Sequence, residues 1–269
     1  MIGAAALLLC LAGAPAQPSR VVVIEDAPSK LVDEAVAGLI KDGKSVEVRA
    51  LGAPLVDAAD TFFLAAGPKS AQALASSTMQ QRAAFLVKAS DAPATLASVA
   101  LDAPLSSQLQ WVKLAFPGRA RVIVPRSSGA ADAALTNAAQ AAGLALVLVD
   151  VKSPGEAVPA VMDALKKSGG PAVILLVPDP VAVTPDTVAP LVQSALADRA
   201  PVVGFSTYFL KVGALAAVAT DAPDMARQAL AATSPGAQAP KSGHLVVDGR
   251  LAERLGVSVH DGPGVEVRR

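Results

Sequence analysis

The residues best suited to chemistry lie in short polar loops that follow apolar runs. The most prominent loop contains Phe205, Ser206, Thr207 and Tyr208, in a chain with only 3% aromatic residues. Two rings and two hydroxyl groups in one loop are suited to stacking on a small organic ligand and hydrogen-bonding to it. The alternative is structural, with Phe205 and Phe209 packing a hinge.

Two further loops carry candidate ligand-binding residues. Ser127 and Ser128 follow an apolar run and precede a helical pattern, where free backbone N–H groups attract a carboxylate. A plain helix cap explains them equally well. Ser90 and Asp91 end another apolar run. Asp179 lies between two prolines, either as a ligand-binding carboxylate or as an ordinary turn residue.

The composition argues against several other functions. Lys and Arg together number 23, as do Asp and Glu, so no basic field is available to hold nucleic acid. His244 and His260 are the only histidines and Cys10 the only cysteine, which makes a zinc site improbable. Neither histidine lies beside an obvious serine or acid of a catalytic set. We therefore expect no enzyme, no metal and no cofactor.

The N-terminus predicts export. Residues 2–13 form an apolar run too short to span a bilayer, and Ala14, Pro15 and Ala16 complete an A-x-A pattern. We predict a signal peptide over residues 1–16, with cleavage before Gln17 and a periplasmic mature protein. The alternative is an apolar tail, because the run has no preceding Lys or Arg.

Strand and helix patterns alternate along the chain, which indicates parallel sheets covered by helices. Polar turns and Gly-containing loops separate them, and a Pro/Gly/Ser-rich connector spans residues 234–243. Trp111 falls on the apolar side of a predicted helix, and we expect it in the core. The predicted strands form two series: 20–24, 46–48, 61–64, 83–87 and 96–101, then 121–124, 145–149, 172–176 and 202–203.

Two connections in this pattern are short. Only residues 51–60 separate the second and third strands, too few for a full crossover helix. Another apolar run, 214–219, begins soon after the strand that ends at Gly204. Because parallel neighbours need a crossover of a dozen residues or more, we expect these two strands in different sheets. The predicted fold class is α/β, with two doubly wound parallel-sheet lobes: residues 17–102 plus 217–243, and residues 103–216 plus 244–269.

A family resemblance is carried by four stretches: GPKSAQAL at 67–74, AFLVKASDAP at 84–93, PVVGFSTYFLKVGALAAVATD at 201–221 and LVVDGRLAERLGVSV at 245–259. Together they resemble the type I periplasmic solute-binding proteins of ABC transporters. The resemblance is to the subfamily described as uncharacterised ABC substrate-binding proteins, some of which take aromatic amino acids. It departs from the family at residues 94–102, which lack the usual Asn-x-Thr-Gly, at Asp248, which replaces an Asn, and in the short second connection.

The resemblance implies a monomeric component of an importer that binds a small, amino-acid-like ligand between two lobes and delivers it to an ABC permease. Asp179 would then be a carboxylate for the ligand's amine. The departures favour an alternative, a degenerate envelope protein with a sensory or scaffold role and no transport ligand. The expected ligand-binding residues are Ser90, Asp91, Ser127, Ser128, Asp179, Phe205, Ser206, Thr207 and Tyr208.

Overall fold

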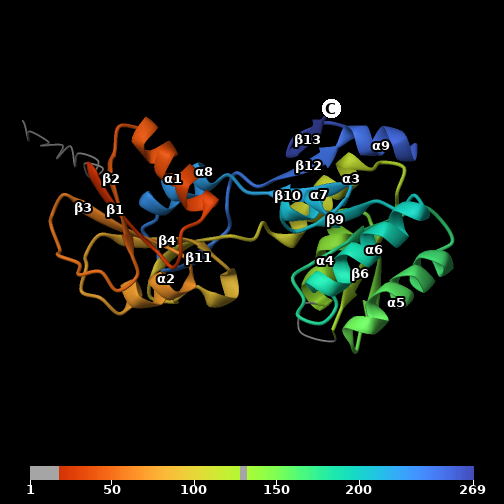
Figure 1. Ribbon diagram of the computed structural model, residues 1–269, viewed down its shortest axis with the longest axis horizontal. Helices are drawn as coiled ribbons and strands as arrows, with labels where there is room; N and C mark the ends of the chain where they lie inside the picture. Colours follow the sequence, from red (N-terminus) through yellow and green to blue (C-terminus); the bar gives the residue numbers. More distant parts are fainter. Residues whose placement is uncertain (1–17, 128–131) are drawn as a thin grey trace, which may run out of the picture.

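A computed structural model describes residues 18–127 and 132–269 and has two α/β lobes (Figure 1), which confirms the predicted fold class. The predicted signal peptide, residues 1–16, and Ser128 lie outside the described residues. The first lobe has a parallel sheet in the order β11-β5-β4-β3-β1-β2. Its elements are β1 (Arg20–Glu25), α1 (Lys30–Lys41), β2 (Ser45–Ala50), β3 (Thr61–Ala66), α2 (Pro68–Ala75), β4 (Arg82–Val87), the 3-10 turn η1 (Ala89–Asp91), β5 (Ala97–Ala100), α8 (Ala222–Leu230) and β11 (Gly236–Gln238).

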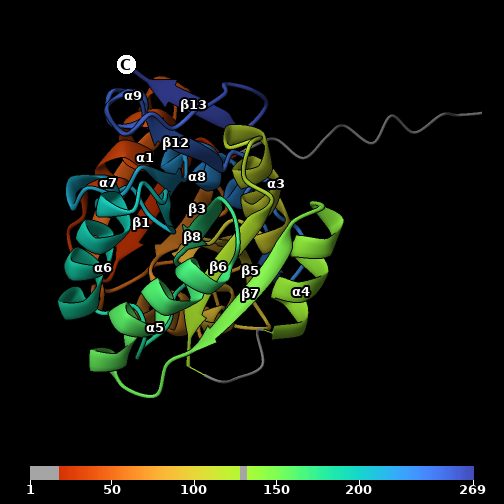
Figure 2. The same ribbon diagram turned by 90° about the vertical axis from the view of Figure 1, so that its right-hand side faces the viewer.

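The second lobe has a sheet in the order β13-β12-β10-β9-β8-β6-β7, in which only the β10–β12 pair is antiparallel. One face is covered by α3 and α4, the other by α5 and α6 (Figure 2). Its elements are α3 (Leu105–Ala115), β6 (Arg121–Arg126), α4 (Asp132–Ala141), β7 (Ala145–Asp150), α5 (Pro154–Lys167), β8 (Ala172–Leu175), α6 (Pro185–Ala197), β9 (Val202–Gly204), α7 (Tyr208–Lys211), β10 (Ala216–Ala219), β12 (His244–Asp248), α9 (Gly249–Leu255) and β13 (Val265–Arg268).

The core of the first lobe is organised around β3, whose six residues are all buried. Successive side chains of a strand point to opposite faces, so Phe62 and Leu64 pack with α1 and α8, while Phe63 and Ala65 pack with α2. Burying a large apolar side chain stabilises a fold by about 1.5–3 kcal/mol. A continuous apolar strand therefore holds helices on both faces of this sheet.

The connection between β2 and β3 contains no helix, as its length predicts. On the face where a helix would lie, β2 presents charged rather than apolar side chains. Glu47 accepts hydrogen bonds from Arg49 at 2.7 Å and Arg20 at 2.8 Å, and Arg49 also donates to the Pro54 carbonyl at 2.7 Å. The bond from Arg49, followed by that from Arg20, lowers the pKa of Glu47 to about 2. This ion-pair network replaces the apolar packing of a crossover helix.

One prediction about the second lobe is wrong: β9 and β10 are parallel neighbours in the same sheet. The chain makes the crossover in residues 205–215, with the single turn of α7 and a turn at Gly213, whose φ of 94° favours glycine. The crossover succeeds because it is tightly packed: a methyl group at Gly204 would lie 2.2 Å from the Phe209 ring. The lobe boundary predicted at residue 217 consequently falls inside β10.

Three segments join the lobes, residues 101–104, 220–221 and 239–243 (Figure 1). The extensive packing between described helices and strands joins elements of the same lobe. Two short edge strands, β11 and β13, have no counterpart in the predicted elements. Among the described helices, none is both long and apolar enough to cross a membrane.

Candidate functional site

The structure brings together three of the predicted loops at one edge of the second sheet. Ser127 follows β6, Asp179 follows β8 and the loop starting at Phe205 follows β9, and these three strands are neighbours in the sheet. Carboxyl ends of parallel strands meet at one edge, which is where open α/β sheets bind ligands. The predicted residues of the second lobe, apart from Ser128, therefore occupy one region.

Asp179 is fully engaged by the protein itself. One carboxylate oxygen accepts bonds from the Ser127 backbone N–H and hydroxyl, both at 2.8 Å. The other accepts from the backbone N–H groups of Val181 at 2.9 Å and Ala182 at 2.7 Å. Burial tends to raise the pKa of Asp179, but bonds from Ala182, Ser127 and Val181 outweigh it and lower the pKa. These four bonds use the usual acceptor sites of a carboxylate, so Asp179 holds the Ser127 loop against the loop after β8.

The aromatic loop divides into a packed part and an exposed part. The Phe205 and Phe209 rings meet edge-on with centroids 4.7 Å apart, and both join the apolar core of the second lobe. Tyr208 is 58% exposed, with its ring 6.1 Å from that of Phe209. Thr207 is exposed and Ser206 half-buried. Phe205 and Phe209 therefore have a packing role, as the alternative interpretation proposed, whereas Tyr208 and the hydroxyl groups of Ser206 and Thr207 are accessible to a ligand.

In the first lobe, the corresponding sheet edge carries Ser90 and Asp91 after β4. Both are exposed, and the Ser90 hydroxyl donates to the Asp91 carboxylate at 2.8 Å. Asp102, at the start of the first linking segment, is half-buried and forms no hydrogen bond or ion pair with any described residue. Burial raises the pKa of Asp102, Lys88 opposes this shift, and Asp91 adds to it.

Two charged residues of these edges were missed by sequence reasoning. Asp26, just after β1, accepts bonds from the backbone N–H groups of Lys69 at 2.8 Å and Ser70 at 2.6 Å, and so caps α2 from a distance. The two donors lie 43 and 44 residues away in sequence, which no local pattern reveals. In both lobes, a carboxylate already occupies backbone donors that could bind an anion.

Arg126 is the second missed residue. An arginine at the end of an apolar strand is unusual, and this pattern in the sequence could have identified it. It is 8% exposed at the end of β6. Its Nη1 lies 2.5 Å from Asp132 and its Nη2 3.2 Å from Asp150, at the end of the neighbouring strand. Nη1 lacks hydrogen-bond alignment with Asp132 despite the short distance, so this contact is an ion pair. A buried cation between two carboxylates fixes the start of α4 and the end of β7 against β6.

The family described as ABC transporter substrate binding protein matches residues 53–235. The chain belongs to this family. The match begins in the β2–β3 connection and ends beyond α8, so it includes strands of both lobes and most loops of the two carboxyl edges. A search of curated proteins finds no significant match.

Several solved structures share the two-lobed fold of this chain. The ligand-free, open structure of CD0873, a Clostridium difficile substrate binding protein with adhesive properties, has a TM-score of 0.71 at 13% identity, covering 93% of this chain and 99% of that one. A Streptococcus pneumonia ABC domain in complex with L-Trp has a TM-score of 0.54 at 18% identity, covering 89% of this chain and 96% of that one. A conserved domain protein from Vibrio cholerae has a TM-score of 0.55 at 18% identity, covering 91% of this chain and 96% of that one.

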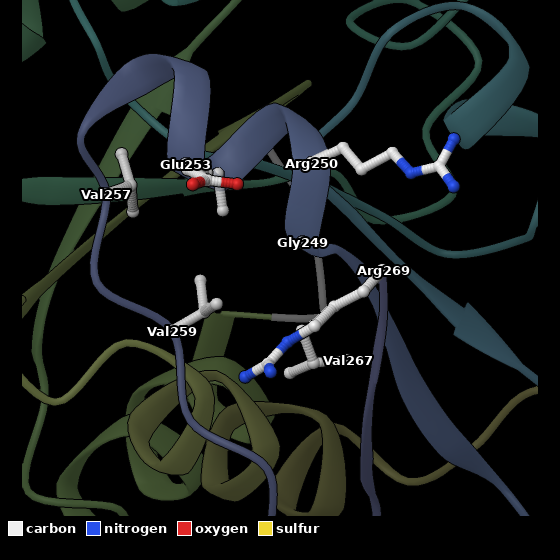
Figure 3. A pocket seen from close by; sticks show the side chains of 8 residues that line it. Gly249, Arg250, Glu253, Val257, Val259, Val267 and Arg269 are labelled. Atoms are coloured by element: carbon white, nitrogen blue, oxygen red, sulfur yellow. The ribbon is translucent and has the colours of Figure 1, made fainter.

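A cavity of about 500 Å³ lies outside the matched part of this substrate-binding chain, between α9 and β13 (Figure 3). Because β12 runs antiparallel to β10, α9 follows at the edge of the sheet opposite the candidate loops. Val257, Val259 and Val267 line the cavity, and the charged groups of Arg250 and Glu253 are exposed. None of the predicted site residues lines it. Within residues 18–127 and 132–269, no group of three or more His, Cys, Asp or Glu could hold a metal ion.

Proposed function

We propose that this protein is the periplasmic solute-binding component of an ABC-type importer and holds a small, amino-acid-like ligand between its lobes. The observation that carries the proposal is the family match, which extends over the candidate loops of both lobes. The protein acts as a monomer without catalysis and delivers its ligand to an ABC permease. Export by the N-terminal segment, with cleavage before Gln17, belongs to the same proposal.

The proposed contacts come from exposed or half-buried side chains at the two carboxyl edges. Tyr208, Thr207 and Ser206 supply ring area and hydroxyl groups from the second lobe, and Ser90 and Asp91 supply polar groups from the first. The ligand in the Streptococcus structure is L-Trp, which supports an amino-acid ligand here. An aromatic ring stacking on Tyr208 adds to affinity beyond the area that it buries.

The role of the remaining candidates follows from their contacts. Asp179 has its acceptor sites filled by Ser127, Val181 and Ala182, so it shapes the site from behind. Ser127 retains a hydroxyl oxygen that can still accept a bond from a ligand amine. We therefore assign amine recognition to Asp91 and Ser127 in preference to Asp179.

The alternative is an envelope protein with a sensory or scaffold role and no transport ligand. Two observations favour it: the helix-free connection between β2 and β3, and the internal carboxylates Asp26 and Asp179 on backbone donors at both edges. A protein of this kind retains the two lobes while its ligand site is lost.

A thermal-shift screen over the amino acids, including L-Trp, and small metabolites separates the two functions. A ligand at one hundred times its Kd stabilises the folded protein by about 2.7 kcal/mol. At about 2–4 °C per kcal/mol, this raises Tm by roughly 5–10 °C. Tyr208→Ala should reduce the shift, whereas Leu114→Ala, an exposed side chain of α3, should not. A screen without any shift would favour the sensory or scaffold role.

A further inference from the structure

The three segments that link the lobes meet at Gly243. A methyl group at this position would lie 3.2 Å from the Ala103 Cβ in the first segment and 3.9 Å from the carbonyl oxygen of Ala219, which precedes the second. It would also lie 3.1 Å from Trp111 of α3. Trp111 packs still more closely on Gly264, where a methyl group would lie 2.1 Å from its indole nitrogen. The hinge is therefore closely packed, and Trp111 covers the point where its segments meet.

The same place contains two buried polar atoms without partners among the described residues. Gln108 on α3 is 5% exposed; its side-chain N–H donates to the Ala103 carbonyl at 2.7 Å, but its Oε1 accepts no bond. The hydroxyl of Ser242, next to Gly243, is buried and also unpaired. Buried polar groups are almost always hydrogen-bonded, and leaving them unpaired costs free energy. Such groups at a hinge suggest a partner that another arrangement of the lobes provides.

Gln108 and Ser242 have complementary chemistry and lie on segments in contact. The Gln108 side-chain N–H donates to the Ala103 carbonyl, and Ala103 lies close to Gly243, the residue after Ser242. A serine hydroxyl donates one hydrogen bond, and an amide oxygen accepts one. The two groups can therefore share one hydrogen bond if a movement of the lobes shifts the third segment relative to the first.

We propose that Ser242 and Gln108 form a hinge latch, in which the Ser242 hydroxyl donates to Gln108 Oε1 when the lobes close. The latch rests on the proposed function only in requiring that the lobes move. In the arrangement described here the latch is open, since neither atom has a hydrogen-bond partner among residues 18–127 and 132–269. The unpaired atoms disfavour this arrangement, and the bond between them favours closure. Because only the closed protein encloses its ligand, the latch raises apparent affinity by raising the closed fraction.

Distance measurements between spin labels test the latch without any ligand. Cys10 is the only cysteine, so a Cys10→Ser background accepts labels at Lys69→Cys and Lys152→Cys, two exposed positions at the carboxyl edges of the two lobes. With the latch, the protein shows a long-distance and a short-distance population. Ser242→Ala should lower the ratio of the short-distance to the long-distance population about three- to ten-fold, because it removes the contribution of one ordinary hydrogen bond.

Matched variants make the result specific. Ser242→Thr keeps the hydroxyl and should retain the ratio, and Ser76→Ala, which removes an exposed hydroxyl of the first lobe, should not change it. An unchanged ratio in Ser242→Ala, or no short-distance population in the unmodified hinge, would overturn the latch. These results are independent of the thermal-shift screen, so a latch without a ligand, or a ligand without a latch, can be recognised.

Discussion

Replacing Asp179 with alanine should destabilise the second lobe. The change removes the acceptor of four hydrogen bonds, two from Ser127 and one each from Val181 and Ala182. A bond to a charged group contributes about 1.5–3 kcal/mol, but the freed donors in this half-buried loop become partly hydrated. The losses are therefore not additive, and we expect a total of roughly 2–4 kcal/mol.

Thermal unfolding measures this loss directly. At about 2–4 °C per kcal/mol, Asp179→Ala should lower Tm by roughly 5–15 °C. Asp163→Ala is the matched control, because Asp163 forms only an exposed ion pair with Lys167 and should change Tm little. An Asp179→Ala protein as stable as the wild type would refute the assignment of Asp179 to holding the Ser127 loop.

The pH dependence provides a second check. The pKa of Asp179 is lower in the folded protein than its ordinary value, because the hydrogen bonds outweigh burial. Its stabilising contribution is therefore complete above the unfolded pKa of about 3.9 and is lost as pH falls through the lower folded pKa. The Tm difference between wild type and Asp179→Ala should stay constant from pH 7 to 5 and shrink below about pH 4. A difference that grows on acidification would contradict this sign.

Three further predictions concern other residues. Gly204→Ala should cost about 1–3 kcal/mol, measured by denaturant unfolding, because its methyl group would overlap Phe209, whereas Gly118→Ala has free space and should be neutral. Asp102→Asn should raise Tm at pH 7, because burial raises the pKa of Asp102 and so disfavours its charged form. Protonation of Asp102 stabilises the wild type as pH falls, so the Tm difference between the two proteins should close in acid. A variant with a lower Tm than the wild type at pH 7 would contradict this. N-terminal sequencing of protein from the native host should begin at Gln17, and an intact Met1 would exclude cleavage.

The sequence predicted the fold class well because alternation is a local signal. Each strand of the first lobe, apart from β11, has its own apolar run, and the ten-residue gap after β2 correctly indicated a missing helix. The pairing of β9 with β10 was predicted wrongly, since an eleven-residue crossover depends on how closely Phe209 packs on Gly204. Tertiary packing of this kind leaves no periodic pattern.

The candidate site was predictable in its location and less so in its chemistry. Loops after strands are visible in sequence, and those containing Ser127, Asp179 and Tyr208 do share one edge of the sheet. The partners of a carboxylate are not visible, because Asp179 bonds a loop 52 residues away and Asp26 caps a helix 43 residues away. Whether a polar side chain faces a ligand or supports its neighbours depends on these long-range contacts.

Hydrogen exchange with and without the best compound from the thermal-shift screen tests the central claim most directly. If the protein binds its ligand between the lobes, amides in the loops after β4 in the first lobe and after β6 and β9 in the second should become protected together. Protection of these loops in both lobes is the result that we predict. Protection confined to one lobe, or to the cavity beside α9, would show that the ligand binds elsewhere.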